Sequence, residues 1–363
     1  MKLISKFNAF LSKYEKISAL LFFALGFAWD WFTVGRIDNI SEIAFLVGYF
    51  ILLSLSIFLS FTYFTFSGLQ KYNAYLGKYL PIATQFFLGG LTSTFVIFIS
   101  RSVSFSRTAV FLFLLVFFFI TNEFFSKKVS FRIQFVHFSI VSFMFFGCIT
   151  PLIFSELDAH VFYIAAAISL AFTFFINTLI FLRVENKDKM KFLKLKIFIG
   201  LAHLAIVIFF ILKLIPPVPL ALKNGFVAYH VKKIDNIYEV TYKPRTWFQI
   251  WNTHENELKF RPHDSVFVFT SIFSPNDIKK KVFHEWFHYD DQTEDWELTD
   301  KIGYTIQGGR NNGFRGYTYK THLVEGEWKV EVVTEEELII GVLNFKINLH
   351  DGERPKKLKT KYF

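Results

Sequence analysis

The sequence predicts a membrane-spanning bundle of about seven helices followed by an all-β, sandwich-like domain. The first observation is composition: 53% of the 363 residues are apolar, 51 are phenylalanine, and few soluble proteins of this length carry so much apolar mass. The second is a change of pattern after residue 215, where long apolar runs give way to short alternating ones. The predicted parts are an amphipathic segment (1–16), a membrane domain (17–215), a β domain (216–348) and a basic tail (349–363).

Seven apolar runs are long enough to cross a bilayer, which needs about 20 residues of helix. They cover 17–35, 43–66, 80–100, 107–125, 132–154, 160–182 and 196–215. Residues 1–16 place their apolar side chains on one helical stripe flanked by lysines, which predicts a helix lying on the cytoplasmic membrane surface.

The distribution of positive charge predicts the orientation of these helices. The net charge of +10 lies wholly in residues 1–215, because residues 216–363 carry equal numbers of basic and acidic side chains. With the N-terminus in the cytoplasm, fifteen lysines and arginines fall on the cytoplasmic side of the predicted spans and four on the other. We therefore expect an extracytoplasmic β domain, and we read the charge as topology rather than as nucleic-acid binding.

Polar residues inside predicted spans are candidates for function. Asp30 and the adjoining Arg36 lie near the end of the first span, and His137 and His203 lie in later ones. In one interpretation, the charged cluster around Asp30 binds a ligand or couples the helices to the outer domain. In the other, Asp30 is an interfacial carboxylate flanked by the anchoring Trp29 and Trp31. A small-solute transporter stays open as an alternative function, although the few charges argue against an ion pump. The single cysteine, Cys148, excludes an internal disulfide.

The C-terminal part reads as short strands separated by turn residues. Pro216 and Pro217 end the last predicted helix, and Trp328, Val330 and Val332 alternate with charged residues as in a half-buried strand. The spacing is typical of an antiparallel sandwich. The predicted strands are 226–232, 236–243, 246–251, 265–273, 279–289, 296–307, 314–322, 327–333 and 338–348.

A glycine-rich stretch, GGRNNGFRGYTYK (308–320), carries Arg310 and Arg315. Backbone N–H groups of such a loop and two guanidinium groups suit a phosphate or carboxylate ligand. The competing interpretation is a tight turn that needs positive φ at Asn and Gly.

The stretch HEWFH (284–288) matches the H-E-x-x-H pattern of zinc metalloproteases. On a helix, His284 and His288 lie one turn apart and bind one zinc, while Glu285 acts as the base. On a strand the Cα atoms of the two histidines lie about 13 Å apart, so one metal cannot take both. Strand-like neighbours and the lack of a third histidine ligand favour the strand.

Several motifs together resemble a known bacterial family. The segments LIPPVPLALKNG, FVFTSIFSP, HEW, GGRNNGFRGYTYK, GEWKVEVVT and IGVLNFKI are similar to the domain of unknown function 2914. The resemblance implies transmembrane helices ahead of one small β-rich domain, and an H-x-W pair made by His284 and Trp286. It implies no reaction.

The expected protein is a multi-pass protein of the bacterial inner membrane whose β domain binds an envelope polymer or a protein partner. Arg310, Arg315, His284 and Trp286 are the candidate binding residues. Neither catalytic residues nor a cofactor are expected, and a zinc metalloprotease is the enzymatic alternative. Ligand-stacking and core roles both remain open for the tryptophans Trp247, Trp251, Trp286, Trp296 and Trp328.

Overall fold

The computed structural model of the protein describes 27–35, 37, 39–65, 74–102, 109–125, 131–183, 189–235, 237–244, 257–261, 264–275, 279–307, 313–322, 324–350 and 358–363. The chain forms two compact units. The helical unit consists of Met1–Phe98, Leu112–Ile149 and Tyr163–Ile208, and the β unit of Ile99–Phe111, Thr150–Phe162 and Phe209–Phe363. The β unit thus includes the connection between the helices α7 and α8 defined below.

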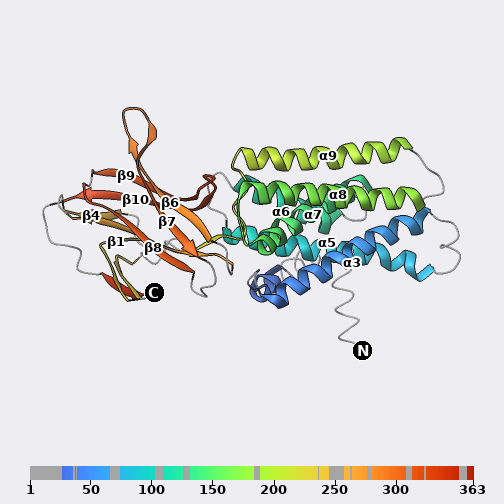
Figure 1. Ribbon diagram of the computed structural model, residues 1–363, viewed down its shortest axis with the longest axis horizontal. Helices are drawn as coiled ribbons and strands as arrows, with labels where there is room; N and C mark the ends of the chain where they lie inside the picture. The colour runs from blue at the N-terminus through green and yellow to red at the C-terminus, as the bar shows by residue number, and fades with distance from the viewer. Residues whose placement is uncertain are drawn as a thin grey trace, which may run out of the picture. The chain divides into compact units, whose positions relative to one another are not determined.

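The N-terminal half is helical, as predicted (Figure 1). Five of its helices are long and apolar enough to cross a membrane: Ile40–Thr62, Tyr79–Ser100, Ile133–Phe154, Ala159–Arg183 and Phe192–Ile211. They belong to five of the predicted spans. The complete helices are α3 (Ile40–Thr65), α5 (Ala74–Ser102), α6 (Ala109–Phe125), α7 (Phe131–Phe154), α8 (Ala159–Arg183) and α9 (Lys189–Ile211).

The other two predicted spans are supported less fully. The span at 107–125 corresponds to α6, which has 17 residues and is the shortest of these helices. Of the span at 17–35, only 27–33 is helical within the described residues. The predicted surface helix at 1–16 and the candidate Arg36 lie outside the described residues.

Phenylalanine rings fill much of the interior of the helical unit. Phe50 of α3 stacks on Phe145 of α7 with ring centroids 4.1 Å apart, and it contacts Phe172 of α8 at 5.3 Å. Such ring pairs add packing contacts between the helices. The phenylalanine-rich composition is therefore used in helix packing.

The C-terminal part forms three sheets (Figure 1). In spatial order, the first contains β1 (Ala221–Ala228), β5 (Val266–Phe273) and β8 (Phe314–Lys320). The second contains β4 (Glu257–Phe260), β10 (Ile339–Leu349), β9 (Gly326–Thr334), β6 (Lys279–Asp290) and β7 (Asp295–Gln307). The third contains β11 (Lys359–Tyr362), β3 (Ile237–Tyr242) and β2 (His230–Ile234).

The strand pairing is antiparallel except between β10 and β4. The sheet β1-β5-β8 contributes to two hydrophobic cores, and alternation along its strands explains how. Val227 and Val268 belong to a core shared with the five-stranded sheet, whereas the adjacent Phe226 and Phe269 belong to a core shared with β2 and β3. Neighbouring strand residues face opposite sides, so β5 is buried along nearly its whole length.

The end of the chain belongs to the β unit. Residues 359–362, for which the sequence predicts a basic tail, form β11 and pair with β3. Phe363 and Tyr238 exchange two backbone hydrogen bonds of 3.0 and 3.1 Å. The predicted strand at 246–251, with Trp247 and Trp251, lies outside the described residues.

Candidate functional site

The stretch HEWFH lies on strand β6, as its strand-like neighbours and the lack of a third histidine ligand predict. His284 and Trp286 point into the core between the sheets, and both are fully buried. The Nδ1 atom of His284 lies 2.8 Å from the Thr318 hydroxyl, to which the indole N–H of Trp286 also donates a hydrogen bond of 3.1 Å. The H-x-W pair therefore meets at one hydroxyl group of the opposite sheet.

The other nitrogen of His284 has partners as well. Its Nε2 atom lies 3.0 Å from the hydroxyl of Thr270 and 3.2 Å from that of Tyr304, and these two hydroxyls are 2.6 Å apart. Burial lowers the pKa of His284 to about 3 and raises the pKa of Tyr304, so both groups are neutral near pH 7. A neutral ring satisfied at both nitrogens ties β6 to β5 and β8. We assign this network to structure rather than to ligand binding.

The strand geometry does not provide the arrangement that a zinc protease needs. Glu285 lies on the opposite side of the strand from His284 and pairs with Lys301 of β7 at 2.7 Å. The Nε2 atom of His288 lies 3.2 Å from the carbonyl oxygen of Glu325, and its ring contacts Trp328. The zinc alternative required His284 and His288 one turn apart on a helix, and residues 279–290 form a strand instead.

Arg315 lies on the other face of its sheet, within a group of aromatic side chains. Its side chain is half-buried beside Tyr238 of β3, with the guanidinium carbon 5.8 Å from the ring centroid. The Nε atom is buried and has no hydrogen-bond partner within the described part of the chain. Lys233 of β2 brings a second positive charge 5.6 Å from the same ring.

Four aromatic rings lie beside Arg315 along β8, β5 and β3; Tyr238 is buried, Tyr317 and Phe267 are partly buried, and Tyr319 is exposed. Centroids lie 6.2 Å apart for Tyr238 and Tyr317, 6.1 Å for Tyr317 and Phe267, and 5.6 Å for Phe267 and Tyr319. Tyr319 is 55% exposed, and β8 is an edge strand of its sheet. We call Arg315, Lys233, Tyr238, Tyr317, Tyr319 and Phe267 the Arg315 face.

The structure thus separates the predicted binding residues. His284 and Trp286 contact Thr318, whereas Arg315 lies an odd number of residues away on the same strand and so faces the opposite side. Arg310 lies outside the described residues. The sequence did not indicate Tyr238 or Phe267 as site residues, because they join Arg315 only through sheet pairing and packing.

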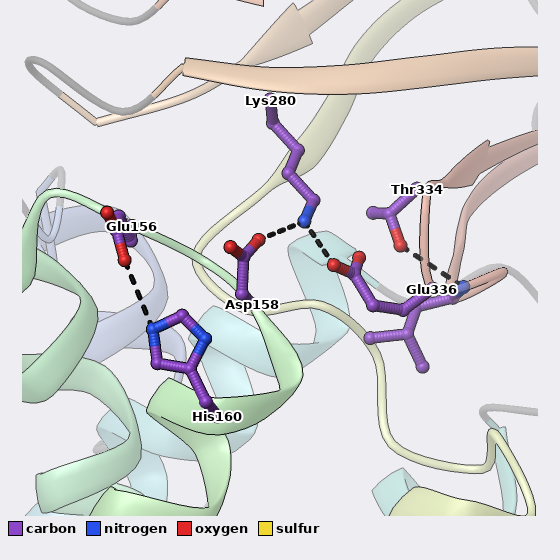
Figure 2. A network of polar contacts seen from close by, with 7 residues as sticks. Glu156, Asp158, His160, Lys280, Thr334 and Glu336 are labelled. Carbon is purple, nitrogen blue, oxygen red and sulfur yellow. Dashed lines mark hydrogen bonds and ion pairs between the residues drawn. The ribbon is translucent and has the colours of Figure 1, made fainter.

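A second polar network lies around Lys280, near the start of β6 (Figure 2). The Lys280 ammonium group is 3% exposed and pairs with both Asp158, in the connection between α7 and α8, and Glu336, in the turn between β9 and β10. The bond from Lys280 and its charge hold the pKa of Asp158 below its ordinary value. Nearby, Lys213 pairs with Glu337 at a more exposed position.

Three side chains beside this network carry metal-ligand atoms. Atoms of Glu156, Asp158 and His160 lie within 4.8 Å of one another. Glu156 and His160 are exposed and contact each other at 3.1 Å, and Asp158 is engaged by Lys280 (Figure 2). The three side chains therefore form a polar cluster in which Glu156 contacts His160 and Asp158 pairs with Lys280, and nothing else in the described structure points to a bound ion.

The predicted intramembrane residues contact hydroxyl groups of neighbouring helices. Asp30 accepts a hydrogen bond of 2.6 Å from Ser93, and the Nε2 atom of His137 lies 2.9 Å from the Thr92 hydroxyl. His203 is bound more extensively. Its Nδ1 atom lies 3.1 Å from Ser139 of α7, and its Nε2 atom lies 3.0 Å from Ser169 of α8.

Comparison with solved structures yields only weak likenesses. An immunoglobulin-like protein from Pseudomonas aeruginosa is 8% identical, with a TM-score of 0.22, over 36% of this chain and 96% of that one. A β-glucosidase from Listeria innocua is 14% identical, with a TM-score of 0.20, over 33% of this chain and 16% of that one. The alkylpurine DNA glycosylase AlkC of Pseudomonas fluorescens is 8% identical, with a TM-score of 0.22, over 86% of this chain and 100% of that one. These scores carry no argument about fold or activity.

A family model provides the informative match. No curated protein matches this chain. Residues 279–347, which span β6 to most of β10, match the family described as Protein of unknown function (DUF2914). The resemblance predicted from the sequence is therefore confirmed for the part of the β-rich region that holds His284, Trp286 and Arg315.

Proposed function

We propose that this protein is a multi-pass protein of the bacterial inner membrane that presents its β unit outside the cytoplasm as a binding module for an anionic envelope polymer. In this proposal seven helices cross the membrane, the N-terminus is cytoplasmic, and the β sheets pack as a sandwich. The five apolar helices and the asymmetry of positive charge support the membrane placement.

The observation that carries the binding proposal is the guanidinium group of Arg315. Its Nε atom is buried and lacks a hydrogen-bond partner, and no ion pair joins Arg315 to an acidic side chain among the described residues. Hydrogen bonds between a guanidinium group and a carboxylate or phosphate are among the stronger ones in proteins. An anionic ligand supplies the missing acceptor.

The aromatic rings indicate which kind of anion fits. Tyr319 and Tyr317 lie on the edge strand β8 on the same side as Arg315, and Phe267 lies opposite Tyr319 in the adjacent strand. A row of rings beside a cation suits an extended ligand that alternates flat apolar surfaces with acidic groups. An acidic polysaccharide has this chemistry.

Binding is tested with the full-length protein in nanodiscs and a polyuronate as the probe, with a neutral glucan of similar length as the control ligand. Arg315→Gln is expected to weaken polyuronate binding by at least about tenfold, because a charge-assisted hydrogen bond contributes about 1.5–3 kcal/mol. Tyr319→Ala is expected to weaken binding less, and the neutral glucan is expected not to bind.

Lys346→Gln provides the matched control, because Lys346 is an exposed lysine on β10 of the five-stranded sheet. Equal losses of affinity for Arg315→Gln and Lys346→Gln would show that the polymer responds only to net charge. Absence of binding by the unsubstituted protein would reject the polymer and favour a protein partner. An inactive alkaline-phosphatase fusion at the C-terminus would contradict the proposed orientation.

A further inference from the structure

Helix α8 carries a polar stripe that faces the interior of the helical unit. Ser169, Thr173 and Asn177 are spaced four residues apart, so they lie on one face of the helix, and each has an exposure of 0%. The neighbouring buried residues on this face, Val161 and Ala165, are apolar. The stripe therefore begins near the middle of α8 and continues toward its C-terminal end.

Two of the three side chains have hydrogen-bond partners. The Ser169 hydroxyl contacts His203 and donates to Ser142 at 3.2 Å, and the Thr173 hydroxyl donates to the Ser169 carbonyl oxygen at 2.8 Å. Asn177 differs, because neither its amide nitrogen nor its amide oxygen has a hydrogen-bond partner among the residues that the structure describes. An asparagine side chain offers two N–H donors and a carbonyl acceptor, and all of them are unused.

An unsatisfied buried amide is costly, and an apolar side chain of similar size would avoid the cost. The free-energy cost of the unsatisfied amide is greater inside a membrane, because the hydrocarbon region holds no water to form the missing hydrogen bonds. Full burial also excludes lipid headgroups and a second copy of the chain as partners of Asn177 within the described surface. A small molecule inside the helical unit can supply the missing hydrogen bonds.

The surrounding residues indicate that such a molecule is uncharged. The buried polar residues described in the helical unit are serine, threonine, asparagine and histidine, and no aspartate, glutamate, lysine or arginine is among them. A neutral environment of this kind does not balance the charge of an ion. It suits a molecule that both donates and accepts hydrogen bonds.

We propose that Asn177 anchors a small site inside the helical unit that holds an uncharged hydrogen-bonding molecule, either water or a small neutral solute. Asn177 lies six residues before Arg183 at the end of α8, which corresponds to about 9 Å along the helix. Asn177 thus lies within two turns of the end of α8. Thr173 lies one turn deeper on the same face of the helix.

Thiol accessibility tests this proposal without knowledge of the ligand. Thr173→Cys is introduced into full-length protein carrying Cys148→Ala, which removes the single native cysteine. A polar methanethiosulfonate reagent is expected to modify this thiol at least about tenfold faster than the thiol of Ala165→Cys, because modification requires a thiolate and hence local hydration. Ala165 is the matched control, since it lies on the same helix face and is 1% exposed.

The role of Asn177 is tested by adding Asn177→Leu to Thr173→Cys. The rate is expected to fall to that of Ala165→Cys, and the thermal stability of the double variant shows that the fold persists. In the purified, dialysed protein, a Thr173→Cys thiol that reacts no faster than the control, or that is unaffected by Asn177→Leu, would overturn the proposal. Comparing freshly prepared membranes with purified, dialysed protein distinguishes the two occupants: a cellular solute protects the thiol only in the membranes, whereas water gives the same rate in both.

Discussion

The two units each bury a histidine whose ring nitrogens both contact hydroxyl groups. His284 of the β unit lies between Thr270, Thr318 and Tyr304, and His203 of the helical unit lies between Ser139 and Ser169. The partners of His284 come from strands of the opposite sheet and from β7. The partners of His203 lie on helices, whose backbone N–H and C=O groups are hydrogen-bonded within each helix.

This difference determines how much each network contributes to the stability of its unit. A serine or threonine inside a helix can donate to the carbonyl oxygen four residues earlier, as Thr173 does, so its partner on another helix is dispensable. The hydroxyl of Thr318 lies between two sheets, where it accepts from Trp286 and contacts His284. We therefore expect the β network to dominate stability and the helical network to leave polar groups, such as Asn177, available for a ligand.

The largest effect is expected for His284→Ala. The substitution removes a buried ring and leaves the hydroxyls of Thr270 and Thr318 with fewer partners, which we expect to cost about 2–4 kcal/mol in the free energy of unfolding. Thermal unfolding of the full-length protein, followed by the fluorescence of the buried Trp286 and Trp328, measures the loss. His230→Ala is the control, because His230 is exposed on β2. Similar unfolding temperatures for both variants would refute the structural role of His284.

The second-largest effect on stability is expected for the loss of a buried ion pair in the β unit, compared with the loss of a more exposed one. Lys280 is 3% exposed and pairs with two carboxylates, whereas Lys213 is 37% exposed and pairs with one. Lys280→Met is expected to cost about 2 kcal/mol because it leaves partly buried carboxylates without a counter-charge, and Lys213→Met about 0–1 kcal/mol. The same unfolding measurement ranks the two. The reverse order would show that solvent screens the Lys280 network.

The sequence predicted a strand at 279–289, within one residue of the observed β6, but it did not predict the roles of the strand's residues. Alternation from Lys280 through Val282, His284 and Trp286 marks one face of the strand, and this face is the buried one. Because Phe283 and Phe287 make the other face apolar as well, hydrophobicity alone does not identify which face packs inward. The position of Lys280 in this alternation was the available sign that one lysine of the KKK run is buried.

The Arg315 face was predictable only in part. The glycine-rich stretch contains Arg315 with Tyr317 and Tyr319, whereas Tyr238 and Phe267 come from strands that are distant in sequence. Their proximity depends on the order β1-β5-β8 and on the packing of β3 against that sheet, which local patterns do not encode. In the helical half, hydropathy predicted the spans, but it did not indicate that Asn177 lacks a partner.

A smaller loss of stability in the β unit is expected as the pH falls from 7.5 to 5.5. Burial lowers the pKa of His284 to about 3, so between about pH 6.5 and 3 the unfolded chain binds a proton that the folded protein does not. Stability is therefore present above pH 6.5 and falls by up to about 1.4 kcal/mol per pH unit as the pH decreases. The unfolding temperature of the unsubstituted protein is expected to fall between pH 7.5 and 5.5, and that of His284→Gln to fall less. Parallel curves over this range would show that His284 does not cause the acid sensitivity, because Asp158 and Glu337 have lowered pKa values and lose their contribution only at lower pH.

The smallest effect is expected for Ser169→Ala in the helical unit. The serine contacts His203 and Ser142, and hydrogen bonds between transmembrane helices average about 0.6 kcal/mol because the separated helices find other partners. Thr318→Val provides the comparison, since it removes a hydroxyl that ties two sheets and is expected to cost about 1–3 kcal/mol. Unfolding of both variants in the same detergent, followed by circular dichroism at helix and sheet wavelengths, measures the two losses. A loss for Ser169→Ala as large as that for Thr318→Val would mean that the helical network is structural throughout, and Asn177 would then be an exception within it rather than part of a polar interior open to ligands.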